Sequence, residues 1–151
     1  MPQDSESEAK LEQEAKFKSY LEALIAPIPG AIAGDVENSY VSLFRTAYGI
    51  PVSDEENLTV HFPTSDGLTL QQTMYDIFSR NSGAFNPLSA AVLVKRYGLT
   101  TGKTQTVKEV AGFLGLTSEK INGIEGRALQ GLRYPTIRDI FIPRFVEIHN
   151  P

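Results

Sequence analysis

The chain contains no cysteine and only two histidines among its 151 residues. The absence of cysteine excludes disulfide bonds and thiolate chemistry. His61 and His149 are far apart in the sequence and lack the spacing of metal ligands, so we predict no metal site and no cofactor. No apolar run is long enough to cross a membrane, and the acidic, polar N-terminus is unlike a signal peptide. We therefore expect a soluble, cytoplasmic protein.

No group of residues has the pattern of a catalytic site. Asp54, Glu55 and Glu56 are adjacent carboxylates, but no base, nucleophile or metal ligand accompanies them. The stretch GLTTGKT (98–104) departs from a phosphate-binding loop, because Tyr97 stands where that motif needs a glycine. We predict no catalytic residue and no enzymatic activity.

Charge is divided unevenly along a chain of otherwise ordinary globular composition. Residues 91–151 hold nine Lys and Arg against five Asp and Glu, whereas residues 1–90 hold five against thirteen, so the net charges are +4 and −8. Such a division is typical of a half that faces nucleic acid beside a half that repels it, and ordinary surface variation produces it as well.

Helical spacing of apolar residues dominates the first half of the chain. It predicts helices over 11–25, from Asp35 to Gly49, and over 69–80, with a short extended stretch at 58–62 that has no obvious partner strand. The predicted fold is an all-α helical bundle with a C-terminal helix-turn-helix. Its predicted divisions are a disordered acidic tail (1–10), an acidic helical module of unknown role (11–87) and the helix-turn-helix domain (88–151).

The second half carries the pattern of a helix-turn-helix after a helix that ends at Gly98. Thr106 and Glu109 have the spacing of a capping box, and Gly115 supplies a residue that adopts positive φ at a sharp turn. Thr117 caps the next helix, which Pro135 ends. The apolar face of that helix consists of Ile121, Ile124, Ala128 and Leu132, with Ala111 and Leu116 where the two helices meet. Spacing alone does not decide the function, because most helical hairpins do not touch DNA.

Residues 88–135 resemble the fourth region of bacterial RNA polymerase sigma factors of the housekeeping class. The resemblance is carried by VLVKRYGL, TVKEVAGFLGLTSEKINGIEGRAL and LRYP, in the family's order and close to its spacing. In that family the domain contacts the upstream promoter hexamer through its recognition helix, and its other surfaces clasp the flap of the polymerase β subunit. The resemblance therefore implies two partners, double-stranded promoter DNA and core RNA polymerase.

The resemblance also implies roles for single residues. Arg96 and Thr106 fall where the family contacts phosphates, and Glu119 falls where its glutamate accepts a hydrogen bond from a base, as a carboxylate does from cytosine. Lys120, Arg127 and Arg133 keep the family's positive charge. The predicted DNA-binding residues are Arg96, Thr106, Thr117, Ser118, Glu119, Lys120, Asn122, Gly123 and Arg127.

The sequence departs from the family on the recognition helix itself. Ser118 and Asn122 replace arginines, Gly123 replaces a glutamine, and Gln130 and Gly131 replace basic residues. Each lost bidentate contact removes about 1–3 kcal/mol of discrimination between bases. The glycines at 123, 126 and 131 each cost about 1 kcal/mol of helix stability relative to alanine. They are explained either by close backbone approach to DNA or a partner protein, or by relaxed selection on that face.

Two hypotheses follow from the sequence. The first is a sigma-like transcription factor that binds promoter DNA and core polymerase, and that needs a partner to open DNA because residues 1–87 show no promoter-melting region. The second is a polymerase-associated or self-associating interaction module with a degenerate helix-turn-helix and little affinity for DNA.

Overall fold

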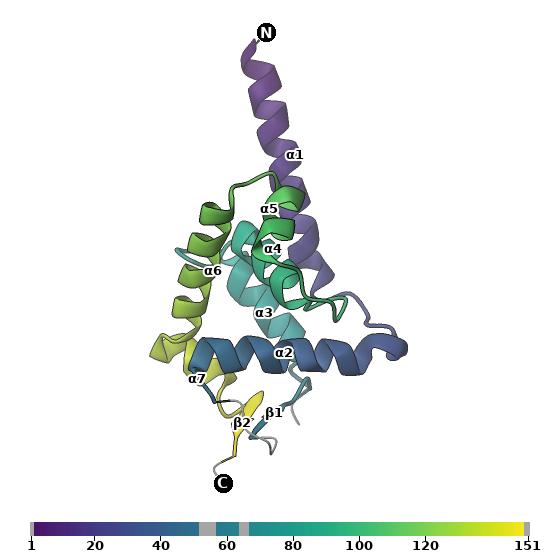
Figure 1. Cartoon of the computed structure of the whole chain (residues 1–151), viewed down its shortest axis with the longest axis vertical. Helices are drawn as coiled ribbons and strands as arrows, with labels where there is room; N and C mark the ends of the chain where they lie inside the picture. The colour runs from purple at the N-terminus through teal and green to yellow at the C-terminus, as the bar shows by residue number, and fades with distance from the viewer. Residues whose placement is uncertain (1, 52–56, 64–66, 150–151) are drawn as a thin grey trace.

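The computed structural model describes residues 2–51, 57–63 and 67–149, with side chains from residue 8 onward. These residues form mainly helices, and a two-stranded sheet lies at the end of the molecule opposite the N-terminus (Figure 1). The predicted all-α class with a minor extended segment is thereby confirmed. No helix among the described residues is both long enough and apolar enough to span a bilayer.

Helix α1 (Pro2–Ala23) begins nearer the N-terminus than the sequence predicted. The sequence predicted a disordered tail at residues 1–10, whereas the structure continues the helix to Pro2. Proline suits the first helical turn, and the acidic residues that follow it favour the positive end of the helix dipole. Residues 8–16 are exposed, and this part of α1 extends beyond the rest of the molecule (Figure 1).

The C-terminal half of α1 packs along α4 (Pro87–Tyr97) and against α5 (Val107–Leu114). Lys16 Nζ donates a 2.6 Å hydrogen bond to the Phe113 carbonyl in the last turn of α5. The Lys95 ammonium lies 3.9 Å from the centre of the Phe113 ring and 4.9 Å from that of Tyr20. Partial burial, with a smaller contribution from nearby Lys16, lowers the pKa of Lys95. These contacts join α1 to the helix-turn-helix.

Most ends of the middle helices lie where the sequence predicted. Helix α2 (Ala33–Tyr48) follows a short 3₁₀ turn, η1 (Gly30–Ile32), and ends at Gly49, whose φ of 65° is left-handed. Asp35, predicted as its N-cap, lies instead in its first turn. Thr69 caps α3 (Leu70–Ser79), and Gly98 ends α4. In Figure 1, α2 crosses below α3, α4 and α6 (Ser118–Leu132).

Two elements near the C-terminus were not predicted. Helix α7 (Pro135–Phe141) begins at the proline that was expected only to end α6, and β2 (Val146–Ile148) follows it. Strand β1 (Leu58–Val60), predicted as extended without a partner, pairs antiparallel with β2, Thr59 facing Glu147. The alternation in β2 covers only three residues, too few to distinguish a strand from a loop in the sequence.

The hydrophobic core does not divide at the predicted boundary between residues 87 and 88. Its main cluster combines α2 and α3 with residues of α4, α6 and α7, including Tyr40, Phe78, Leu93, Leu132 and Phe141. A second cluster fills the space between α1, α4, α5 and α6. Its α1 member is Phe17, which is 8% exposed. The helix-turn-helix therefore shares both clusters with the N-terminal half of the chain.

Candidate nucleic-acid interface

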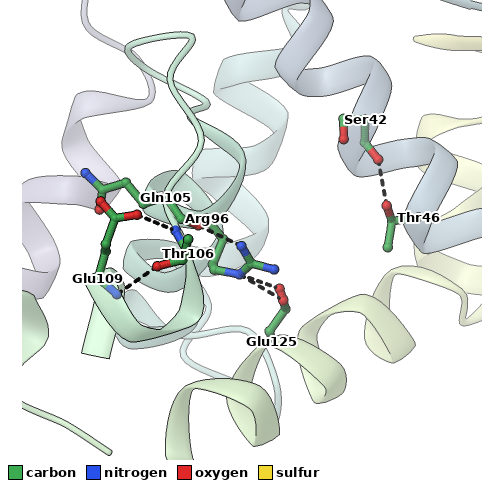
Figure 2. A network of polar contacts seen from close by, with 7 residues as sticks. All are labelled: Ser42, Thr46, Arg96, Gln105, Thr106, Glu109 and Glu125. Carbon is green, nitrogen blue, oxygen red and sulfur yellow. Dashed lines mark hydrogen bonds and ion pairs between the residues drawn. The ribbon is translucent and has the colours of Figure 1, made fainter. Parts of the chain in front are cut away.

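Helices α5 and α6 form the helix-turn-helix that the sequence predicted. The Thr106 hydroxyl accepts a hydrogen bond from the Glu109 backbone N–H at 3.1 Å, and the Glu109 carboxylate accepts one from the Thr106 N–H at 3.1 Å. Gly115 ends α5 with a φ of 70°, and the Thr117 hydroxyl accepts from the Lys120 N–H at 3.1 Å. Figure 2 shows the capping box at the start of α5. These predicted caps and the glycine turn are confirmed.

The apolar face of α6 is buried, and its opposite face is open to solvent. Ala111 at the crossing of α5 and α6 is buried, whereas Leu116 is half-buried beside it. The buried residues of α6 include the four that were predicted, Ile121, Ile124, Ala128 and Leu132, together with Glu125 and Gly131. Its exposed residues include Ser118, Glu119, Lys120, Asn122, Gly123 and Arg127. Every predicted DNA-binding residue of α6 therefore lies where a bound molecule can reach it.

The two predicted threonines, Thr106 and Thr117, are exposed as well, but their hydroxyl groups cap helices. Thr106 and Thr117 each use the side-chain oxygen to accept a capping hydrogen bond. Because a hydroxyl also carries a donor proton, each can still donate to an external oxygen. The structure thus places both threonines at helix starts that face solvent.

Arg96 is engaged inside the protein. Its Nε donates a 3.0 Å hydrogen bond to the carboxylate of Glu125 on α6, and its Nη1 donates a 2.6 Å bond to the backbone carbonyl of Gln105 (Figure 2). Glu125 is 8% exposed, which makes Arg96 the compensating charge for a buried carboxylate. The pair joins α4 to α6 and to the loop before α5. A phosphate contact by Arg96 stays a prediction, and its role in the fold was not foreseen.

Arg133 is likewise bound within the protein. Its guanidinium donates from Nε to the Ala47 carbonyl, and Nη2 lies 3.5 Å from the Thr46 carbonyl. Both carbonyls belong to the last turn of α2, where a cation also favours the negative end of the helix dipole. By contrast, the side chains of Lys120 and Arg127 have no hydrogen-bond or ion-pair partner among the described residues. Of the cations assigned by resemblance on α6 and just after it, these two are left for an external anion.

The glycines of α6 separate into two kinds. A methyl group added at Gly123 or Gly126 would have nothing within 4 Å, so packing inside this chain does not require glycine there. At Gly131 the added carbon would lie 2.8 Å from Cζ of the Phe85 ring. Packing therefore explains Gly131, whereas no contact within the chain requires glycine at 123 or 126.

Replacement of Gly126 by alanine is expected to raise the free energy of unfolding by about 1 kcal/mol, because it adds helix propensity without a clash. Gly131→Ala serves as the comparison, since the Phe85 ring must shift to admit the methyl group and the gain is offset. Urea unfolding of both variants checks this. Equal stabilisation by the two substitutions would contradict the distinction.

The two histidines each follow a strand of the sheet and both lie beside the Glu147 carboxylate, although their spacing in the sequence did not suggest it. His61 Nε2 lies 3.2 Å and His149 Nε2 lies 3.9 Å from the carboxylate oxygens of Glu147. Thr59 and His149 also form a 2.8 Å hydrogen bond. His61 is partly exposed, as expected for a histidine at a wet edge. Among the residues that the structure describes, no group of three or more His, Asp or Glu is arranged to hold a metal ion.

Comparison with known proteins gives no family for this chain. No family model matches the sequence, and no solved structure matches the fold.

Proposed function

We propose that this chain is a sigma-like DNA-binding protein that inserts the N-terminal half of α6 into the major groove of duplex DNA. The observation that supports this most is the open face of α6. It follows a tight glycine turn and is covered by no other described element at Ser118, Glu119, Asn122 and Gly123. The major groove of B-DNA is wide enough for an α-helix, and hydrogen-bonding side chains there distinguish base pairs.

The exposed residues have complementary tasks in this proposal. Glu119 accepts a hydrogen bond from the amino group of cytosine, and Asn122, one turn further along the same face, pairs with the edge of adenine. Lys120 and Arg127 neutralise backbone phosphates, which position the protein without identifying bases. Gly123 and Gly126 let the helix backbone lie close to the groove, which accounts for glycines that the fold itself does not need.

Docking on the β flap of core RNA polymerase is the second part of the proposal and rests on the resemblance of residues 88–135. With α6 facing DNA, the remaining helices are available to contact the polymerase. We expect both DNA binding and polymerase binding to take place in the cytoplasm. A pull-down of purified core polymerase with the full chain tests it. Retention of polymerase that is unaffected by Glu119→Ala would support separate surfaces, and absence of retention would remove the sigma-like part of the proposal.

An interaction module with little DNA affinity is the alternative, and two features favour it. The face of α6 contains glycines instead of several basic residues, and residues 1–90 carry a net charge of −8 that repels phosphates. A small-residue face suits close packing of another helix as well as it suits DNA. Binding to duplexes separates the two functions.

The test is a selection from a pool of randomised duplexes, followed by fluorescence anisotropy at several salt concentrations. A DNA-binding protein should enrich a sequence and lose affinity with a log-log salt slope of about −0.9 per phosphate contact. Glu119→Ala should relax the preference at one base pair by about 1–3 kcal/mol, whereas Lys120→Ala should weaken binding to all duplexes alike.

Two results would contradict this proposal. Enrichment of no sequence together with weak binding at low salt would favour the interaction module. Equal effects of Glu119→Ala and Lys120→Ala on every duplex would remove the assignment of Glu119 to a base.

A further inference from the structure

A hollow of about 250 Å³ lies beside α6, on the side that faces the turn at 83–84 and the start of α4. From α6 it is lined by Lys120, Ile124 and Arg127. The opposite wall is formed by Ala84, Asn86, Leu88 and neighbouring residues. The hollow thus adjoins the open face of α6 but includes residues that the sequence did not single out.

The charge around this hollow is positive and uncompensated. Its lining contains two cations and no carboxylate. Neither Lys120 nor Arg127 has an anionic partner in the described part of the chain, whereas Arg96 is paired with Glu125. Two unpaired cations bordering one concave site favour the binding of an anion, since the attraction of both acts at the same place.

The first turn of α4 forms a wall of the hollow and does not supply its charge. The Asn86 side chain accepts from the Ser89 N–H at 2.9 Å, and the Ser89 hydroxyl accepts from the Asn86 N–H at 3.0 Å. The Ala90 N–H is bound to the Asn86 carbonyl. The helix start is therefore already capped. What it adds is Leu88, an apolar surface next to Ile124 and suited to the edge of a sugar.

We propose that this hollow seats one backbone phosphate of the duplex, held jointly by Lys120 and Arg127, with the adjoining deoxyribose against Leu88. The inference rests on the proposed function. It adds that residues 83–89, opposite α6, form a second wall of the phosphate site. This wall fixes how far α6 enters the groove, because a phosphate held between α4 and α6 cannot slide along the helix.

Placing a carboxylate in the hollow is the first test. Ala84→Glu and Ala9→Glu give chains of the same net charge, and residue 9 lies on the exposed part of α1, away from the hollow. Ala84→Glu should weaken binding to the selected duplex about 10-fold at low salt, the loss expected for one charge-assisted contact. Ala9→Glu should change it by less than about 2-fold, since solvent screens distant charges. Equal losses would overturn the proposal.

The second test asks whether the two cations share one phosphate. In the double variant Lys120→Met, Arg127→Met the salt slope should fall by about 0.9, the amount for one phosphate contact. A fall of about 1.8 would mean two separate phosphates and would overturn the shared seat. Thermal melting by circular dichroism establishes that each variant is folded.

The outcomes distinguish failure of the phosphate site from failure of the proposed DNA-binding function. Absence of duplex binding by the unmodified chain would overturn the proposed function and the seat with it. Tight binding that Ala84→Glu and the double variant leave unchanged would overturn the seat alone. Amide shifts at Lys120 and Arg127 on adding inorganic phosphate, without any effect of these variants on duplex binding, would assign the hollow to free phosphate and also overturn the proposal.

Discussion

Replacing Phe17 with alanine is expected to lower the free energy of unfolding by about 3 kcal/mol or more. The ring comes from α1 but is buried in the cluster formed by α4, α5 and α6, together with Val92, Val110 and Leu114. Its removal leaves a cavity between α1 and the helices α4, α5 and α6, which neighbouring side chains fill only in part. Urea denaturation followed by circular dichroism measures the effect.

Leu11→Ala is the matched control on the same helix. Leu11 is 63% exposed on the projecting part of α1, so its truncation should change stability by less than about 0.5 kcal/mol. If Phe17→Ala were as mild as Leu11→Ala, α1 would not belong to the core of the helix-turn-helix. In that case residues 88–151 would share with the N-terminal half only the main cluster, which α2 and α3 form with α4, α6 and α7.

Removing the positive partner of Glu125 has the second large expected effect. Arg96→Met should lower the free energy of unfolding by about 2–3 kcal/mol, because it leaves a buried carboxylate and the Gln105 carbonyl without their donor. The side chains of Arg96 and Glu125 are 28% and 11% exposed. We therefore expect a smaller loss of stability than for a fully buried pair, because solvent screens the charges. Equilibrium unfolding in urea checks the value.

The double variant Arg96→Met, Glu125→Leu tests whether the stability lost in Arg96→Met comes from leaving Glu125 without its partner. It should recover most of the stability that Arg96→Met loses, since an apolar pair replaces both charges. Lys120→Met is the control, because its ammonium has no partner in the described part of the chain and its loss should leave stability within about 0.5 kcal/mol. A loss in the double variant as large as in the single one would show that Arg96 stabilises the fold without Glu125.

The candidate site could be predicted from the sequence to a large extent. The capping residues Thr106 and Thr117, the turn at Gly115 and the buried face from Ile121 to Leu132 are all local features. Each depends on residues three or four positions apart, and helix geometry brings those together wherever the helix lies. The same periodicity identified which side chains of α6 would be exposed.

The partners of the cations could not be predicted in this way. Arg96, Arg127 and Arg133 look alike in the sequence, yet the folded chain pairs the first with Glu125 and the third with the end of α2, and leaves the second unpaired within its described part. A hint was present in Glu125, a carboxylate beside the apolar positions of α6. Its pairing with Arg96 depends on how α4 crosses α6, which no local pattern specifies.

The sequence by itself determined where most helices begin and end and which face of each is apolar, because caps, glycine turns and helical spacing act over a few residues. Only the tertiary structure decided that Phe17 completes the helix-turn-helix, that β1 pairs with β2, and that a hollow opens between α6 and the start of α4. Those features join segments distant in the chain, and their geometry follows from how whole helices pack together.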